Sequence, residues 1–170
     1  MVLNKLKNIK LLLLDVDGVL TDGGIIYNDN GAETKVFNVK DGLGMRLLME
    51  AGIHLGIITG RRSNALYCRC KDLGINLIYD GVRNKIDVLD EVLDQTGVSA
   101  EEVAFIGDDL PDLKLMKTIG LSIAVGDAHK VILDNADMVT SANGGHGAVR
   151  EVCETILKAK GLWENILERL

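Results

Sequence analysis

Short apolar runs recur along this sequence and alternate with segments of helical spacing, which is the strongest indication of its fold class. Such runs are typical of strands buried on both faces, and we predict strands at residues 10–16, 53–59, 75–79, 103–107 and 121–125. Between them, apolar residues three or four positions apart predict amphipathic helices at 43–51, 63–73, 84–96 and 112–119. Strands joined through helices form a parallel sheet with right-handed crossovers. The sequence therefore predicts a three-layer α/β fold with a central parallel sheet.

One segment interrupts this alternation just after the first predicted strand. Residues 25–27 and 34–37 have the composition of two short strands, and the intervening Asn28-Asp29-Asn30-Gly31 is typical of a turn. We therefore expect a β-hairpin insertion at about 24–39, which is too small to be a separate cap domain. An isolated two-stranded ribbon cannot bury its apolar residues, so we expect this hairpin to need a partner surface.

Length and composition favour a single domain. The 170 residues contain no internal repeat, low-complexity stretch or Pro/Ser-rich linker. We expect one domain over 1–170, with a C-terminal tail at about 161–170. The chain has 19 Lys and Arg against 25 Asp and Glu, and the resulting net charge of −6 argues against nucleic acid as a partner.

No segment of the sequence is typical of a membrane span or an export signal. The apolar runs are far shorter than the roughly 20 residues that a spanning helix needs. The start, MVLNKLKNIK, lacks a long apolar stretch before a cleavage site. We therefore expect a cytoplasmic protein without membrane contact. The cysteines Cys68, Cys70 and Cys153 lack metal-ligand spacing, and we predict that they are small buried hydrophobic residues.

Polar residues follow the predicted strands at the points where those strands end. In open α/β sheets, ligands bind outside the carboxyl ends of the strands, so these residues are candidates for one site. In chain order, they are Asp15, Asp17 and Gly18 after the first strand, Thr59, Arg61 and Arg62 after the second, Lys85 after the third, and Asp108, Asp109 and Asp112 after the fourth.

These residue types suit phosphoryl transfer, in which catalysis is mostly positioning and charge stabilisation. Asp15 can act as a nucleophile that forms an aspartyl-phosphate, and Asp17 can protonate the leaving alcohol and then deprotonate water. Thr59, Lys85 and backbone N–H groups near Gly18 can bind phosphoryl oxygens. Because several carboxylates repel one another and a phosphate, we expect a hard divalent cation, Mg²⁺, at the site.

Each feature taken alone also has an ordinary structural explanation. An isolated Asp-x-Asp is usually a turn or cap feature, and Thr59-Gly60 also suits a turn at a strand end. A single lysine such as Lys85 is most often solvated, and Asp108-Asp109 suits the start of a helix. All four features in this order and spacing are hard to obtain by chance.

The ordered motifs resemble those of haloacid dehalogenase-superfamily phosphatases, and they span most of the chain. The matching residues are Asp15-Val16-Asp17-Gly18-Val19-Leu20-Thr21-Asp22, Thr59, Lys85, and Gly107-Asp108-Asp109 with Asp112. The resemblance implies a Rossmann-like fold with Asp15 as nucleophile and Asp17 as general acid and base. It also implies Mg²⁺ bound by Asp15, Asp108 and the Asp17 backbone carbonyl, with Asp109 and Asp112 as supporting acids.

Further segments resemble the capless subgroup of that superfamily, which acts on sugar acid phosphates. They are the hairpin in place of a cap, Lys40-Asp41-Gly42-Leu43-Gly44, residues 59–63 and residues 144–151. This resemblance implies hydrolysis of 3-deoxy-D-manno-octulosonate 8-phosphate for lipopolysaccharide synthesis.

The same subgroup implies a homotetramer assembled through hairpins, in which the C-terminal tail reaches toward the adjoining subunit's site. The helical apolar spacing of residues 162–170 leaves open the alternative that the tail packs on its own subunit. Arg61 and Arg62 are suited to pair a substrate carboxylate, and they equally suit a solvated helix start.

Other functions stay open from the sequence. A phosphatase for a nine-carbon 2-keto-3-deoxy sugar acid phosphate, or for another sugar phosphate, fits the same motifs. A phospho-acceptor signalling domain also combines Asp, Thr and Lys on a doubly wound sheet, but its acceptor Asp ends the third strand, where this chain has Tyr79-Asp80-Gly81. A catalytically silent regulatory or oligomerisation domain is disfavoured because no expected catalytic position is substituted.

Overall fold

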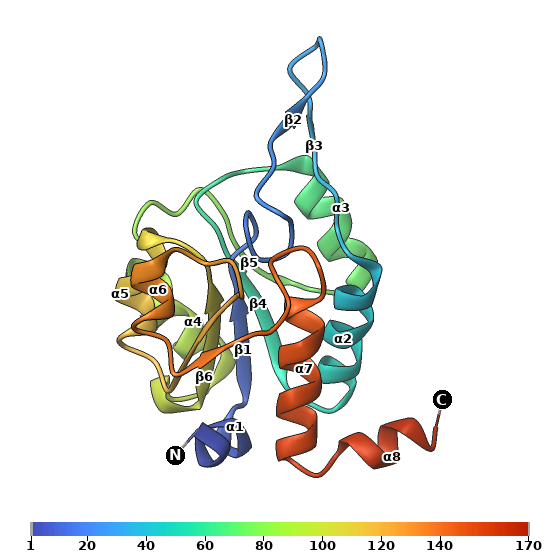
Figure 1. The fold of residues 1–170 in the computed structure, drawn as a ribbon, viewed down its shortest axis with the longest axis vertical. Coiled ribbons are helices and arrows are strands. Elements are labelled where there is room, and N and C mark those ends of the chain that lie inside the picture. The colour runs from blue at the N-terminus through green and yellow to red at the C-terminus, as the bar shows by residue number, and fades with distance from the viewer. Residues whose placement is uncertain (1, 170) are drawn as a thin grey trace.

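The computed structural model describes residues 2–169 and contains a six-stranded parallel sheet in the order β5-β4-β1-β6-β7-β8 (Figure 1). The strands are β1 (Leu11–Leu14), β4 (His54–Ile58), β5 (Leu77–Tyr79), β6 (Val103–Gly107), β7 (Leu121–Ala124) and β8 (Met138–Val139). The predicted α/β class with a central parallel sheet is confirmed. Because β1 lies between β4 and β6, the residues after it open onto the middle of the carboxyl edge.

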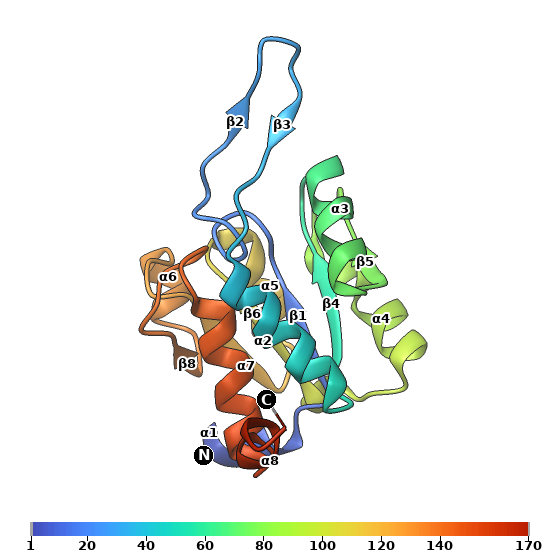
Figure 2. The same ribbon diagram turned by 90° about the vertical axis from the view of Figure 1, so that its right-hand side faces the viewer.

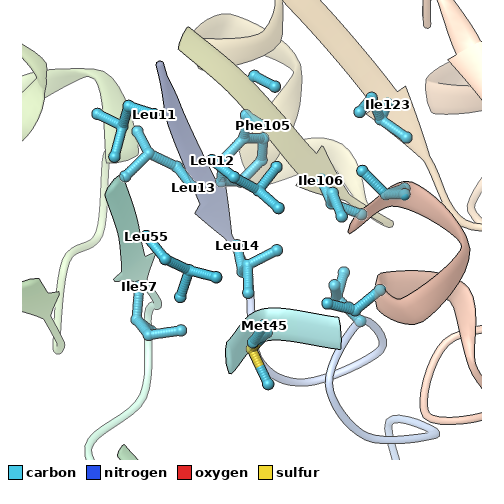
Figure 3. Packing of buried hydrophobic residues seen from close by; sticks show 14 of the residues in the cluster. Leu11, Leu12, Leu13, Leu14, Met45, Leu55, Ile57, Phe105, Ile106 and Ile123 are labelled. Atoms are coloured by element: carbon cyan, nitrogen blue, oxygen red, sulfur yellow. The ribbon is translucent and has the colours of Figure 1, made fainter. Parts of the chain in front are cut away.

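The hydrophobic core is built around β1, whose leucines at 11–14 are all fully buried. Figure 3 shows these leucines among Leu55, Phe105 and Ile106 from the two neighbouring strands. A strand covered on both faces needs a continuous apolar run rather than alternation, which is the pattern that residues 11–14 supply. This packing fixes the point at which Asp15 leaves the sheet.

Helices cover both faces of the sheet, as Figure 1 shows. On one face lie α2 (Val39–Glu50), α3 (Asn64–Leu73) and α7 (Ala148–Ala159), and on the other lie α4 (Leu89–Thr96), α5 (Leu113–Met116) and α6 (Lys130–Leu133). Three short 3-10 helices, η1 (Lys85–Val88), η2 (Ala100–Glu102) and η3 (Leu110–Asp112), precede α4, β6 and α5. No helix within residues 2–169 is long and apolar enough to cross a membrane.

Several helix boundaries differ from the sequence prediction. Helix α2 begins at Val39 rather than at residue 43, because the Asn38 side chain accepts a hydrogen bond from the Lys40 backbone N–H at 2.8 Å and caps the helix there. The predicted helix at 84–96 divides into η1 and α4, and the one at 112–119 is α-helical only in α5.

The prediction also omits β8, α7 and α1 (Val2–Asn8). Among the cysteines, Cys70 and Cys153 are buried as predicted, but Cys68 is exposed. Two positions apart on a helix, Cys68 and Cys70 point in nearly opposite directions, so only one of them can face the core.

The hairpin insertion is present, with β2 (Ile26–Tyr27) paired antiparallel to β3 (Glu33–Thr34). Gly31 has a φ of +74° in its turn, which is why glycine suits that position. Strand β3 is shorter than the predicted 34–37, because Lys35 turns to contact Asp17 and Phe37 packs against the core. The hairpin projects beyond the body of the molecule (Figure 2), with Ile26 and Tyr27 exposed.

The last helix, α8 (Trp163–Leu167), packs on its own chain. Arg150 and Lys158 of α7 lie over the Trp163 ring, 5.8 and 5.1 Å from its centroid, and Leu162 and Ile166 pack against the core. Figures 1 and 2 place α1 and α8 at the end of the molecule opposite the hairpin.

Candidate active site

The carboxyl ends of the central strands meet around a cavity of about 400 Å³. The predicted site residues that line it are Asp15, Asp17, Thr59, Arg61, Lys85, Asp108 and Asp109. Gly18 and Asp112 lie just behind this lining, against Asp108 and Lys85. Arg62 is the exception among the predicted residues, because it lines a neighbouring hollow with Glu33, Tyr67 and Asp80.

Lys85 is held between two carboxylates at the floor of the cavity. Its side chain is only 3% exposed, and its Nζ lies 2.8 Å from Asp15 Oδ2 and also donates to Asp112 Oδ1. Burial alone would lower the pKa of Lys85, but the two carboxylates outweigh burial and raise it above its ordinary value. Lys85 is therefore a fixed positive charge beside Asp15.

Asp112 organises the loop that follows β6. It is buried, and its Oδ2 accepts hydrogen bonds from the backbone N–H groups of Asp108 at 2.9 Å and Asp109 at 3.3 Å. The Asp109 side chain in turn accepts from the Leu110 N–H at 2.8 Å and caps η3. Asp112 thus links Lys85 to the loop that presents Asp108, while Asp109 closes the turn.

Three carboxylates in this region are close enough to share a cation. Oxygens of Asp15, Asp108 and Asp112 lie within 4.8 Å of one another. The Asp108 Oδ1 atom is buried without a hydrogen-bond partner in the described part of the chain. Burial, together with Asp15 and Asp112, raises the pKa of Asp108 to about 8. An unpartnered buried carboxylate oxygen among all-oxygen donors fits a hard divalent cation such as Mg²⁺.

Asp15 is similarly buried at the end of β1. Burial raises its pKa to about 6, Lys85 opposes that rise, and Asp112 adds to it. Its Oδ1 accepts a hydrogen bond from the Val16 N–H at 2.7 Å. The carboxylate is therefore fixed by its own loop on one oxygen and by Lys85 on the other.

Asp17 faces a second set of charges, which come from the hairpin and from the loop after β4. Lys35 contacts Asp17 Oδ1, and Arg61 Nε lies 3.5 Å from Asp17 Oδ2. Arg61 also pairs with Glu33 at 2.7 Å and donates to the Tyr27 hydroxyl at 2.9 Å. The hydrogen bond from Arg61 lowers the pKa of Glu33 below its ordinary value. Ion pairs thus connect the hairpin to residues at the carboxyl edge of the sheet.

Comparison with known proteins gives the family. A family described as haloacid dehalogenase-like hydrolase matches residues 74–152. The chain is 48% identical over 160 residues to the 3-deoxy-D-manno-octulosonate 8-phosphate phosphatase of Escherichia coli strain K12, which covers 94% of this chain and 85% of that relative.

The chain belongs to the haloacid dehalogenase-like hydrolases.

Solved structures of related hydrolases have the same fold. A crystal structure of the corresponding phosphatase from Moraxella catarrhalis, in complex with a magnesium ion, a phosphate ion and a KDO molecule, is 45% identical, with a TM-score of 0.96 over 99% of this chain and 97% of that one. The phosphatase from Yersinia pestis is 47% identical, with a TM-score of 0.94 over 96% of this chain and 88% of that one. The predicted family and its Rossmann-like fold are confirmed.

Sequence reasoning missed three charged residues around the cavity of this hydrolase. Arg83 lines the cavity two positions before Lys85, and its place after a strand end was a usable signal. Lys35 and Glu33 belong to the hairpin, where a charged residue on a short strand is ordinarily solvent-facing. Their contacts with Asp17 and Arg61 depend on how the hairpin folds back over the edge of the sheet, which local sequence does not specify.

Proposed function

We propose that this hydrolase cleaves the phosphate ester of 3-deoxy-D-manno-octulosonate 8-phosphate through an aspartyl-phosphate on Asp15. The observation that carries this proposal is the 48% identity, over 94% of the chain, to a phosphatase named for that substrate. The arrangement of Asp15, Asp17, Lys85 and Asp108 around one cavity supports it.

In the first step, an Asp15 oxygen attacks phosphorus and the bond from phosphorus to the sugar oxygen breaks. Asp17 gives its proton to that oxygen, so the sugar acid leaves as a neutral alcohol at that position. Lys85 and Thr59 bind the non-bridging phosphoryl oxygens, together with the backbone N–H groups near Gly18. Lys85 is suited to this role because its charge is fixed and partly neutralises the site.

In the second step, water attacks the aspartyl-phosphate. Asp17, now ionised, takes the proton from the water as the new bond to phosphorus forms. The bond between phosphorus and the Asp15 oxygen breaks, which regenerates the carboxylate and releases phosphate. Asp17 thus serves as acid and then as base. It is ionised at the end of the first step, as the second step requires, and protonated at the end of the second step, as the first step requires.

The residues that would hold Mg²⁺ are Asp15, Asp108 and the backbone carbonyl of Asp17. When bound, the cation supplies positive charge that offsets repulsion between the carboxylates and the phosphate dianion. Asp112 and Asp109 support these ligands indirectly, because their hydrogen bonds shape the loop after β6.

Arg61 is the better placed of the two predicted carboxylate partners. It lines the catalytic cavity, whereas Arg62 is 79% exposed and faces Asp80 at 3.7 Å in the adjoining hollow. We assign Arg61 to bind the part of the sugar acid that lies near the phosphate. Arg62 contributes only if the sugar extends past the pair formed by Arg61 and Glu33.

The exposed apolar surface of the hairpin supports a homotetramer, which the resemblance also implies. Ile25, Ile26, Tyr27 and Val36 are all about half exposed or more, on a two-stranded ribbon that has no core of its own. We propose that hairpins of several copies cover one another, on a chain that forms one catalytic domain over 1–170 and acts in the cytoplasm without nucleic-acid or membrane partners.

A panel of phosphate esters assayed with and without Mg²⁺ tests the function. We expect the highest kcat/KM with 3-deoxy-D-manno-octulosonate 8-phosphate, lower values with its nine-carbon analogue and with hexose phosphates, and no turnover without the cation. A higher value for the nine-carbon acid would reassign the substrate but keep the phosphatase. Absence of hydrolysis across the panel would overturn the enzyme assignment.

A further inference from the structure

The lysine on the hairpin strand is buried to a degree that a surface ribbon does not explain. The Lys35 side chain is only 2% exposed, although the ribbon around it is open to solvent. Its ammonium contacts Asp17 Oδ1 and lies 3.5 Å from Glu33 Oε1. Lysine is almost never fully buried unless it is paired, so this placement depends on the carboxylates that it meets.

The two oxygens of Asp17 are held unequally. Lys35 contacts Oδ1, while Arg61 Nε lies 3.5 Å from Oδ2. That Nε makes no hydrogen bond within residues 2–169, and 3.5 Å is long for one. Arg61 and Asp17 line the cavity, whereas Lys35 does not. Oδ2 is therefore the oxygen that remains available to a substrate.

We propose that Lys35 is a positioning residue for Asp17: by holding Oδ1, it fixes the carboxyl group so that Oδ2 faces the leaving oxygen of the substrate. This inference rests on the proposed function, because it assigns a partner to the group that transfers the proton. Glu33 completes the arrangement, since it pairs with both Lys35 and Arg61.

This contact makes proton transfer depend on the hairpin. Lys35 is 18 positions from Asp17 and reaches it only when the hairpin lies over the edge of the sheet. A carboxyl group that is free to rotate presents its proton to the leaving oxygen for only part of the time, and small misplacements of a reacting group are costly. Loss of Lys35 therefore slows the release of a leaving group that needs a proton from Asp17 more than the release of one that needs none.

Leaving-group dependence separates this role from a structural one. p-Nitrophenyl phosphate releases a phenolate that needs little protonation, whereas the leaving oxygen of a sugar phosphate must be protonated so that it leaves as an alcohol. We expect Lys35→Met to lower kcat and the single-turnover rate for 3-deoxy-D-manno-octulosonate 8-phosphate by roughly 10- to 100-fold, with KM little changed. The single-turnover release of p-nitrophenol, which precedes the step in which Asp17 acts as a base, should fall by less than about threefold. Equal losses on both esters, or no loss on either, would overturn the proposal.

Two further variants sharpen the comparison. Lys35→Arg keeps a cationic donor and is expected to recover most of the lost kcat on the sugar phosphate. Lys40→Met, the same change at an exposed lysine at the start of α2, is the matched control and is expected to leave both esters unaffected. Failure of Lys35→Arg to recover any activity, with its unfolding transition intact, would contradict a positioning role.

A double-mutant cycle with Asp17→Asn tests whether Lys35 acts through Asp17. If it does, Lys35→Met adds no further loss of kcat on the sugar phosphate in the Asp17→Asn background. A further loss there would show that Lys35 supports the fold instead. If Lys35→Met does not unfold cooperatively, Lys35→Gln, which keeps a hydrogen-bond donor, takes its place in all of these assays. A wild-type protein that hydrolyses neither ester with Mg²⁺ would overturn the proposed function as well.

Discussion

The Asp108 carboxylate packs so closely on Gly18 that a Cβ at position 18 would lie 2.1 Å from Asp108 Oδ2. Gly18 also has a φ of +86°, a conformation that other residues adopt at a cost. The loop after β1 therefore sets the position of a proposed cation ligand that follows β6. A methyl group at this position would displace the carboxylate rather than merely strain the loop.

We accordingly expect Gly18→Ala to weaken activation by Mg²⁺ by about tenfold or more, because Asp108 must move away from its place beside Asp15. Titration of activity with Mg²⁺, together with calorimetric measurement of Mg²⁺ binding, gives the change in affinity. The matched control is Gly97→Ala at the end of α4, where φ is +69° but nothing lies within 4 Å of the added Cβ. An identical Mg²⁺ dependence in both variants would contradict the steric argument.

Asp15→Asn is expected to lower kcat on the order of 10³-fold or more while the thermal unfolding transition persists, because an amide has nearly the same shape but is a far poorer nucleophile. Steady-state kinetics and circular dichroism measure the two effects. Asp94→Asn, at an exposed position of α4, controls for the loss of a negative charge. Turnover at the wild-type rate in Asp15→Asn would rule out the covalent mechanism.

Asp112→Ala is expected to cost about 3–5 kcal/mol in the free energy of unfolding, because it leaves the buried Lys85 with one carboxylate fewer and two loop N–H groups without their acceptor. Asp134→Ala removes an exposed pair with Lys130 and is expected to cost less than about 1 kcal/mol. Urea unfolding followed by circular dichroism compares the two variants. A cost for Asp112→Ala no larger than that of the control would contradict the structural role.

Asp137 joins the start of β7 to α1, since its carboxylate accepts from the Ser122 N–H at 3.0 Å and from Lys5 at 2.6 Å. Partial burial opposes ionisation, but Lys5 and Ser122 outweigh it and hold the pKa of Asp137 below its ordinary value. A lowered pKa in the folded state gives stability that is present above the unfolded-state pKa and lost as pH falls through the folded-state pKa.

Asp137→Asn is therefore expected to lower the free energy of unfolding by about 1–3 kcal/mol at pH 7. The gap between the variant and the wild type should shrink as pH falls below the ordinary range for aspartate. Urea unfolding at a series of pH values measures both quantities. A gap that stays constant or widens toward low pH would contradict the assigned direction of the pKa shift.

For substrate recognition, Arg61→Ala is expected to raise KM for the sugar acid phosphate by roughly 10-fold or more, since charged hydrogen bonds contribute about 1.5–3 kcal/mol. Arg62→Ala, one position along the chain, is expected to change KM by less than about threefold, because its side chain faces the adjoining hollow. A larger effect at Arg62 would place the carboxylate of the substrate in that hollow.

Much of the fold was accessible from the sequence because the buried strands are unambiguous. The run at 11–14 is apolar at every position and is followed directly by Asp15, so both the strand and its end were evident. Strand β8 was missed because it has two residues, which is too short for any periodic pattern. Helix α7 was missed although its buried residues follow helical spacing, with Val149, Val152 and Ile156 on one face.

The candidate site was likewise predicted only in part from the sequence. Residues at strand ends were found because parallel strands bring their carboxyl ends to one edge. The partners of those residues were not found, because they depend on side-chain packing between distant segments. Asp112 beneath Lys85 and Lys35 against Asp17 are contacts across 27 and 18 positions, and no local pattern predicts either.

The position of α1 and α8, at the opposite end of the molecule from the hairpin, has a practical consequence. The catalytic cavity and the proposed assembly surface both lie toward the carboxyl edge of the sheet. An affinity tag, a fluorescent reporter or a linker to a solid support joined to either helix would extend away from that edge. The protein can therefore be immobilised through either end with its cavity facing the solution.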